Sequence, residues 1–159
     1  EEFSDEYYQA DVFFRNNNGA FSDMTAKSGL GSTGISRSPV EADLNADGFP
    51  DLVVGTIDGP PRVYINACSE DVSWIGLRFK TDNSNRSAIG TRVTVEANGR
   101  IHIREIGSGN DGLYGGGPSE LSIGLGDAQE IERLHIRWPN GSTNEWKNLP
   151  VKRWLTLWE

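Results

Sequence analysis

The chain is poor in cysteine, in long apolar runs and in basic residues. Its one cysteine, Cys68, excludes an internal disulfide, and with no histidine or basic residue nearby it is better read as a buried thiol than as a nucleophile. No run of about 18 apolar residues occurs, so membrane insertion is not expected. The 15 Lys and Arg against 23 Asp and Glu give a net charge of −8, which argues against a nucleic-acid partner.

Familiar catalytic motifs are also missing. The sequence has no Gly-x-Ser-x-Gly elbow, no His-Glu-x-x-His motif and no phosphate-binding P-loop. Its two histidines have no carboxylate and nucleophile that can be identified as partners, so a non-enzymatic role is expected. An enzyme would instead need a deep polar pocket with a perturbed pKa, for which segment 107–117 is the candidate.

What the chain does contain is glycine, with 19 residues, and short segments in which apolar and polar residues alternate. Alternation with period two is typical of strands, and no convincing amphipathic helix is present, so an all-β fold is expected. Asn98-Gly99 and Asn140-Gly141 lie between such segments and predict hairpins. The expected strands are 12–14, 51–55, 62–66, 74–81, 91–97, 100–106, 120–124, 133–138, 144–147 and 154–158, with turns near 26–30 and 127–131.

The most informative segment is the loop 43–51, which places oxygen-bearing residues at every second position around Gly48. Calcium takes six to eight oxygens at about 2.3–2.6 Å, and a glycine permits the sharp turn that such a loop needs. The loop has no His or Cys, which disfavours zinc and iron. A hydrophilic turn without an ion is the less favoured alternative. The predicted calcium ligands are the side chains of Asp43, Asn45, Asp47 and Asp51 and the carbonyl of Phe49.

This loop does not match an EF-hand. An EF-hand places a bidentate Glu at the twelfth loop position, which is Val54 here. The flanking segments 39–42 and 51–55 predict strand, loop and strand instead of helix, loop and helix. The sequence of segment 63–66 is weakly similar to that of segment 13–16, and the distance of about fifty residues between them fits the spacing of propeller blades.

Two resemblances together cover almost the whole chain. Segments 11–30 and 40–66, with the Asp-rich loop between strands, resemble the FG-GAP/VCBS repeats of integrin-type and bacterial adhesion propellers, in which that loop binds calcium. Segments 85–93, 121–126 and 131–141 resemble the ASPIC/UnbV domain that follows such repeats in cartilage acidic protein-like and bacterial secreted proteins.

A partial β-propeller blade with a calcium loop is therefore expected over residues 1–70. An antiparallel β-sandwich or barrel-like domain is expected over residues 71–159, because the composition shifts around residues 68–73. The resemblances imply a calcium-stabilised, non-enzymatic adhesion or recognition module, secreted or on the cell surface (extracellular or periplasmic). It would be the C-terminal part of a larger propeller protein with a protein or glycan partner. The alternatives are an accessory or catalytic component of UnbV-like natural-product biosynthesis and a glycan-binding module.

Two predicted strands carry basic stripes that alternate with apolar residues. If these strands were neighbours, the stripes would form a cationic patch for carboxylated or sulfated glycans or for an acidic partner. The favoured alternative is a solvated face whose arginines pair with Glu96, Glu105 or Glu132. In both strands the apolar residues, Ile101 and Ile103 among them, are expected to face the core. The stripes consist of Arg100, His102 and Arg104, and of Arg133, His135 and Arg137.

The tryptophans suggest a further surface. Trp138 is in phase with Leu134 and Ile136, which places it in the core. Trp154 and Trp158 share one face of their strand and are predicted to lie on an inter-domain or partner surface.

Overall fold

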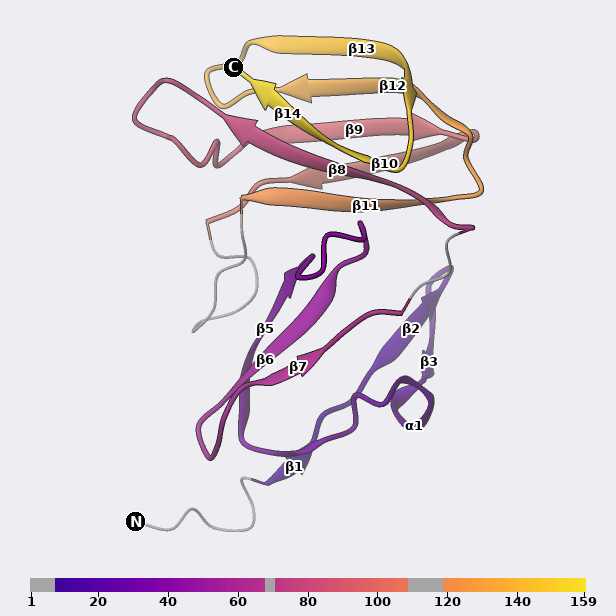
Figure 1. Cartoon of the computed structure of the whole chain (residues 1–159), viewed down its shortest axis with the longest axis vertical. Coiled ribbons are helices and arrows are strands. Elements are labelled where there is room, and N and C mark those ends of the chain that lie inside the picture. Colours follow the sequence, from indigo (N-terminus) through magenta and orange to yellow (C-terminus); the bar gives the residue numbers. More distant parts are fainter. Residues whose placement is uncertain (1–7, 68–70, 109–118) are drawn as a thin grey trace.

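The computed structural model describes residues 8–67, 71–108 and 119–159. Over these residues the chain is almost entirely β, with one four-residue helix, which confirms the expected fold class. Of the helices in this described part, none has the length and hydropathy of a membrane-spanning segment. Figure 1 shows two parts stacked along the long axis of the molecule, with the N-terminal strands below and the C-terminal strands above.

The N-terminal part is built from small antiparallel units. Strands β5, β6 and β7 form a three-stranded sheet, β2 and β3 form a hairpin, and β1 pairs with β4. The loop 43–50 joins β5 to β6, so the predicted order of strand, loop and strand is confirmed. The elements are β1 (Gln9–Ala10), β2 (Phe14–Asn17), β3 (Ala20–Asp23), α1 (Thr25–Ser28), β4 (Thr33–Gly34), β5 (Ser36–Ala42), β6 (Asp51–Thr56) and β7 (Arg62–Tyr64).

This part buries little of its apolar surface. Ile35 and Val54 are its buried apolar residues, whereas many larger side chains remain exposed. A sheet that leaves apolar side chains on its surface is typical of a repeat unit whose stability depends on neighbours. The exposed apolar residues of this part are Tyr8, Val12, Phe13, Phe14, Phe21, Leu44, Ile57, Val63 and Ile65.

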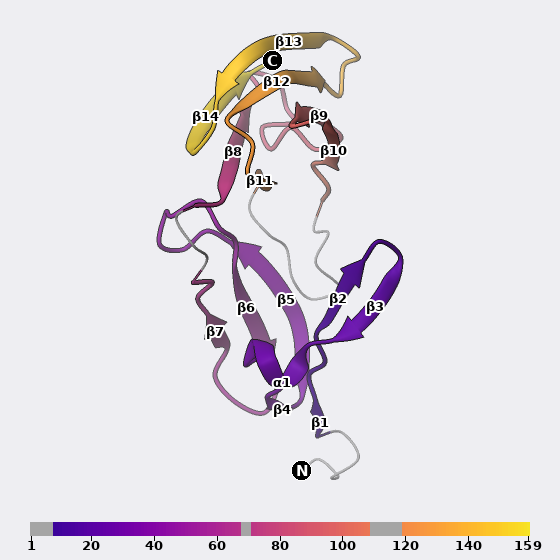
Figure 2. The ribbon, with the colours of Figure 1, turned by 90° about the vertical axis from the view of Figure 1, so that its right-hand side faces the viewer.

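The C-terminal part contains two sheets with a common core. One has the strand order β10-β9-β12-β13 and the other β11-β8-β14. Figure 2 shows β8 and β14 on one side of this part and β9 and β10 on the other. The expected antiparallel sandwich is correct except that β14 runs parallel to β8. The strands are β8 (Ser73–Lys80), β9 (Arg92–Ala97), β10 (Arg100–Glu105), β11 (Glu120–Gly126), β12 (Glu130–Arg137), β13 (Thr143–Pro150) and β14 (Arg153–Trp158).

Alternating residues of these strands fill the core. Ile75 and Leu77 of β8 point inward together with residues of β9 and β12, and Trp138 is fully buried as predicted. The Nε1–H of Trp138 donates a hydrogen bond to Oδ1 of Asn144 at 2.5 Å, so its one polar atom is satisfied. The rest of the buried cluster consists of Phe79, Ala88, Val93, Val95, Ala97, Ile106, Ile123, Leu125, Ala128, Ile131, Leu134, Ile136 and Leu157.

Both predicted Asn-Gly hairpins are present. Asn98 and Gly99 have φ angles of 49° and 68°, as a two-residue turn with two positive φ angles requires, and they set Ala97 opposite Arg100. At the second site the N–H of Gly141 donates to the carbonyl of Trp138 at 3.0 Å, and Gly141 has a φ of 91°. This is a β-turn followed by a left-handed glycine, the usual form of a longer hairpin loop.

Candidate functional site

The loop between β5 and β6 curls around the side chain of Asp43. Its Oδ1 accepts the N–H of Asp47 at 3.1 Å and its Oδ2 accepts the N–H of Gly48 at 2.9 Å. Such Asx interactions replace backbone pairing in a tight turn. Two residues adopt left-handed backbone angles, Ala46 with a φ of 60° and Gly48 with a φ of 91°, and only the second has the freedom of a glycine.

Three of the predicted ligands converge in this curl. The N–H of Asp47 lies 3.1 Å from Oδ1 of Asp43 and 3.2 Å from Oδ1 of Asn45, so these two side-chain oxygens are close to each other. Nδ2 of Asn45 is 2.8 Å from Oδ2 of Asp47. In the described parts of the chain no group of three or more His, Cys, Asp or Glu side chains has the arrangement of a metal site. The cluster in this loop has two carboxylates and an asparagine. An all-oxygen donor set of two carboxylates and one amide suits a hard cation such as calcium.

Asp51 lies at the start of β6 and has a different role from the other three. It is only 1% exposed, and its two oxygens accept backbone N–H groups, Oδ2 from Leu44 at 2.9 Å and Oδ1 from Asn66 at 2.8 Å. It therefore ties the beginning of the loop to the chain that follows β7. Its assignment as a metal ligand, like that of the Phe49 carbonyl, stays a prediction.

The loop also contacts the C-terminal part through Gly48. A Cβ atom on Gly48 would lie 1.8 Å from Cε2 of Trp74, so the backbone packs directly on the indole ring. The hydroxyl of Ser122 donates a hydrogen bond to the carbonyl of Gly48 at 2.6 Å. Sequence reasoning missed this contact, because no pattern links position 48 with position 122.

The two basic stripes do not form one patch. β9 lies between β10 and β12, and the pairing register sets His102 opposite Val95 but His135 opposite Thr94. Directly opposed residues of neighbouring strands share a face. The stripe Arg100, His102 and Arg104 therefore lies on the side of the core valines, and the stripe Arg133, His135 and Arg137 lies on the outer face.

The expectation that Ile101 and Ile103 face the core is wrong for the same reason. Ile101 is opposite Glu96 on the outer face, and the two isoleucines are 65% and 47% exposed. His102 is partly buried, and this burial, followed by the charges of Arg104 and Arg100, lowers its pKa.

On the outer face, Arg133 pairs with acidic neighbours. Its Nη2 contacts Glu96 and its Nη1 lies 3.4 Å from Glu145, which agrees with the predicted alternative of a solvated, ion-paired face. The hydrogen bond from Arg133 lowers the pKa of Glu96, and the same bond raises the pKa of Arg133. Arg92 is also 3.9 Å from Glu105. Because Arg133 and Arg92 are paired with neighbouring carboxylates, these two arginines contribute little to an anion site.

Trp154 and Trp158 occupy the outer face of the β11-β8-β14 sheet. Trp154 packs edge to face on Trp74 with 6.2 Å between ring centroids, and the Arg78 guanidinium lies 4.3 Å from its ring. It also lines a cavity of about 120 Å³ formed by residues of both parts, Asp43 included. Trp158 is 56% exposed, with Lys80 at 5.3 Å. Trp154 thus lies beside the contact between the two parts, and Trp158 lies on the free surface.

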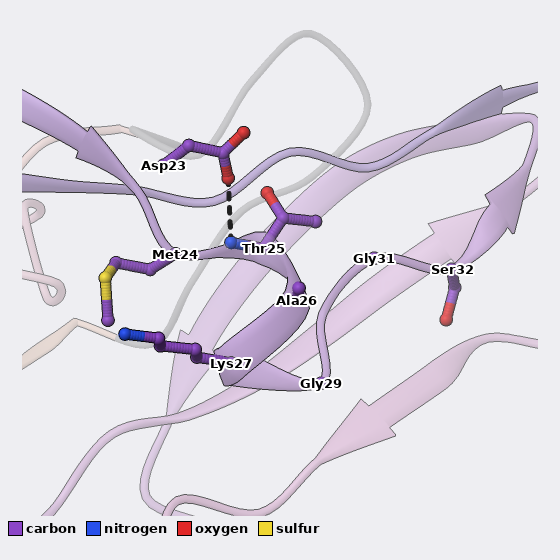
Figure 3. A pocket seen from close by; sticks show the side chains of 8 residues that line it. All are labelled: Asp23, Met24, Thr25, Ala26, Lys27, Gly29, Gly31 and Ser32. Atoms are coloured by element: carbon purple, nitrogen blue, oxygen red, sulfur yellow. Dashed lines mark hydrogen bonds between the residues drawn. The ribbon is translucent and has the colours of Figure 1, made fainter.

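A second hollow, of about 570 Å³, surrounds α1 (Figure 3). Figure 3 shows the Asp23 carboxylate directed at the N–H of Thr25, which it accepts at 2.9 Å, and hydrogen bonds with Thr25 lower the pKa of Asp23. Among the described residues that line it, the side chains do not form the nucleophile–base pair of covalent catalysis. Segment 107–117, where the sequence predicted the polar pocket of an enzyme, falls outside the described residues from position 109 onward.

The fold and the loop define a class of protein, an all-β chain in which a propeller-type blade precedes a separate β domain. Two protein-family models match the corresponding parts of the chain. Residues 4–54 match the FG-GAP-like repeat, and residues 81–159 match ASPIC and UnbV. The chain therefore consists of an FG-GAP-like repeat followed by an ASPIC/UnbV domain, an extracellular-type repeat module. No curated protein matches the chain.

Proposed function

We propose that the chain is a non-catalytic recognition module in which calcium, bound by the loop 43–51, stabilises the FG-GAP-like blade. The observation that carries the proposal is that the side chains of Asp43, Asn45 and Asp47 lie together in a curled loop between two strands, with Oδ1 of Asp43 and Oδ1 of Asn45 on the same backbone N–H. Without a cation the carboxylates of Asp43 and Asp47 repel each other, and a divalent ion removes that repulsion. The FG-GAP-like repeat supports a secreted or cell-surface location, where millimolar calcium occupies even weak sites.

The exposed apolar side chains of the blade support a larger assembly. A single blade cannot bury both of its faces, so the proposal includes neighbouring blades in a longer propeller protein. Recognition of a protein or glycan partner is assigned to the ASPIC/UnbV domain, because the loop itself faces that domain through Gly48.

The test is thermal unfolding of the chain in calcium and in EGTA. Calcium should raise the melting temperature, and the increment should grow with the logarithm of the calcium concentration once this exceeds the dissociation constant. Asp47→Ala should abolish this increment, because it removes one of the converging carboxylates. As a matched control, Asp82→Ala in the C-terminal part should leave the increment unchanged. A melting temperature that responds neither to chelation nor to Asp47→Ala would refute the calcium assignment.

A further inference from the structure

The outer face of the β11-β8-β14 sheet has a recess in which the calcium loop sits. The strand register places Ser122, Gly76 and Trp154 side by side on neighbouring strands. A Cβ atom on Gly76 would lie 2.2 Å from Cδ2 of Trp154, so the indole of Trp154 lies flat against the glycine backbone. Trp74, two residues earlier on the same face, packs edge to face on that indole. The two tryptophans and Ser122 therefore surround one seat.

Gly48 occupies this seat. It is buried, whereas its neighbours Ala46 and Asp47 in the same loop are exposed. Two contacts hold it, the face of Trp74 against its α-carbon and the hydroxyl of Ser122 on its carbonyl. A side chain at position 48 would collide with the ring, so the close approach depends on glycine.

The same residue also contacts Asp43, one of the predicted calcium ligands. The N–H of Gly48 donates to Oδ2 of Asp43 at 2.9 Å, while its carbonyl accepts from Ser122 at 2.6 Å. Any displacement of Gly48 thus changes the position of the Asp43 carboxylate, and any rearrangement around Asp43 changes the seat on Trp74.

We infer that cation binding by the loop and docking of the ASPIC/UnbV domain on the blade are coupled through Gly48. The inference rests on the proposed function, since it adds a domain contact to the proposed calcium site. Coupling between two equilibria is reciprocal, so complete loss of docking weakens calcium binding by the same factor by which calcium strengthens docking. Loading of the loop then favours the docked arrangement of the two domains.

Calcium titration calorimetry on the full chain tests this coupling. Ser122→Ala and Trp74→Leu, neither of which removes a predicted ligand, should each raise the calcium dissociation constant by about fivefold or more. Ser142→Ala, in an exposed hairpin loop, and Trp158→Leu, on the same sheet face but exposed, are the matched controls and should bind as the wild type does. Ser122→Ala removes only one partly buried hydroxyl, so it keeps the test valid if Trp74→Leu does not fold.

Fluorine NMR gives a second measurement. All five tryptophans follow residue 73, so the blade contains none. In the chain labelled with 5-fluorotryptophan, EGTA should move the Trp74 signal and leave the signal of Trp138 in the core unchanged.

The outcomes separate the two proposals. A wild type that binds calcium while Ser122→Ala and Trp74→Leu bind equally tightly, or whose Trp74 signal ignores EGTA, overturns the coupling and leaves the calcium site intact. A wild type that takes up no calcium overturns both.

Discussion

Replacing Asp51 with alanine separates two ways in which a loop carboxylate can stabilise the blade. The side chain is almost fully buried, and its two oxygens hold the backbone N–H groups of Leu44 and Asn66. It joins the β5–β6 loop to the segment after β7 without needing an ion. Its contribution to stability should therefore persist when calcium is removed.

The expected loss follows from these two hydrogen bonds. A hydrogen bond to a charged group contributes about 1.5–3 kcal/mol, and an N–H left without a partner adds a desolvation cost. Leu44 and Asn66 are exposed residues, so water can reach part of the vacated space and reduce that cost. We expect Asp51→Ala to lower the free energy of unfolding of the blade by about 2–4 kcal/mol.

The assay is urea denaturation followed by circular dichroism, with calcium and with EGTA. Amide hydrogen exchange at Leu44 and Asn66 reports the same loss at the two donors themselves. Asp47→Ala is the control, because its one backbone contact is the local bond from Phe49 at 2.9 Å, and most of its effect should disappear in EGTA. If Asp51→Ala destabilises the blade only in calcium, or no more than Asp47→Ala does in EGTA, Asp51 acts as a metal ligand and the reasoning is wrong.

Two further predictions concern the C-terminal part. Gly76→Ala should lower the free energy of unfolding of this part by about 1–3 kcal/mol, because the new methyl group displaces Trp154. Tryptophan fluorescence in urea measures this loss. The control is Gly124→Ala, which should change the free energy of unfolding far less because no atom lies within 4 Å of the added Cβ. The pKa of His102 is lower in the folded protein than in the unfolded chain, so the unfolded chain binds this proton more readily. The free energy of unfolding therefore decreases as the pH drops below about 6.5 toward the lower folded pKa. His102→Gln should make the free energy of unfolding less dependent on pH between about 7 and 5.5, and an unchanged pH profile would contradict this.

Local turn chemistry made much of the C-terminal sheet predictable. The Asn98-Gly99 turn, the alternating strands around it and the buried Trp138 all follow from patterns that involve a few consecutive residues. The loop 43–51 was predictable as a connection between two strands for the same reason, because the spacing of its polar residues is local. The parallel pairing of β14 with β8 was not, since it joins segments about 80 residues apart.

The orientation of β10 shows what a periodic pattern leaves open. Alternation tells which residues share a face but not which face is buried. The two-residue turn fixes which face of β10 is turned toward the core, because the turn places His102 opposite Val95, and Val95 belongs to the core. Of β5 only the part 39–42 beside the loop was predicted. The structure extends this strand back to Ser36 through a bulge between Ser36 and Pro39, where an edge strand tolerates a proline.

The basic residues of β10 have a consequence for the behaviour of the molecule in a concentrated solution. Within the described residues β10 pairs with β9 alone, so its other side is an open sheet edge. Open edges recruit strands from other molecules, and inward-pointing charges are a known defence against that. A second chain that extended this sheet would have to bring its own side chains against Arg100, His102 and Arg104. The charges that were predicted to attract a partner lie where they disfavour strand pairing between identical molecules.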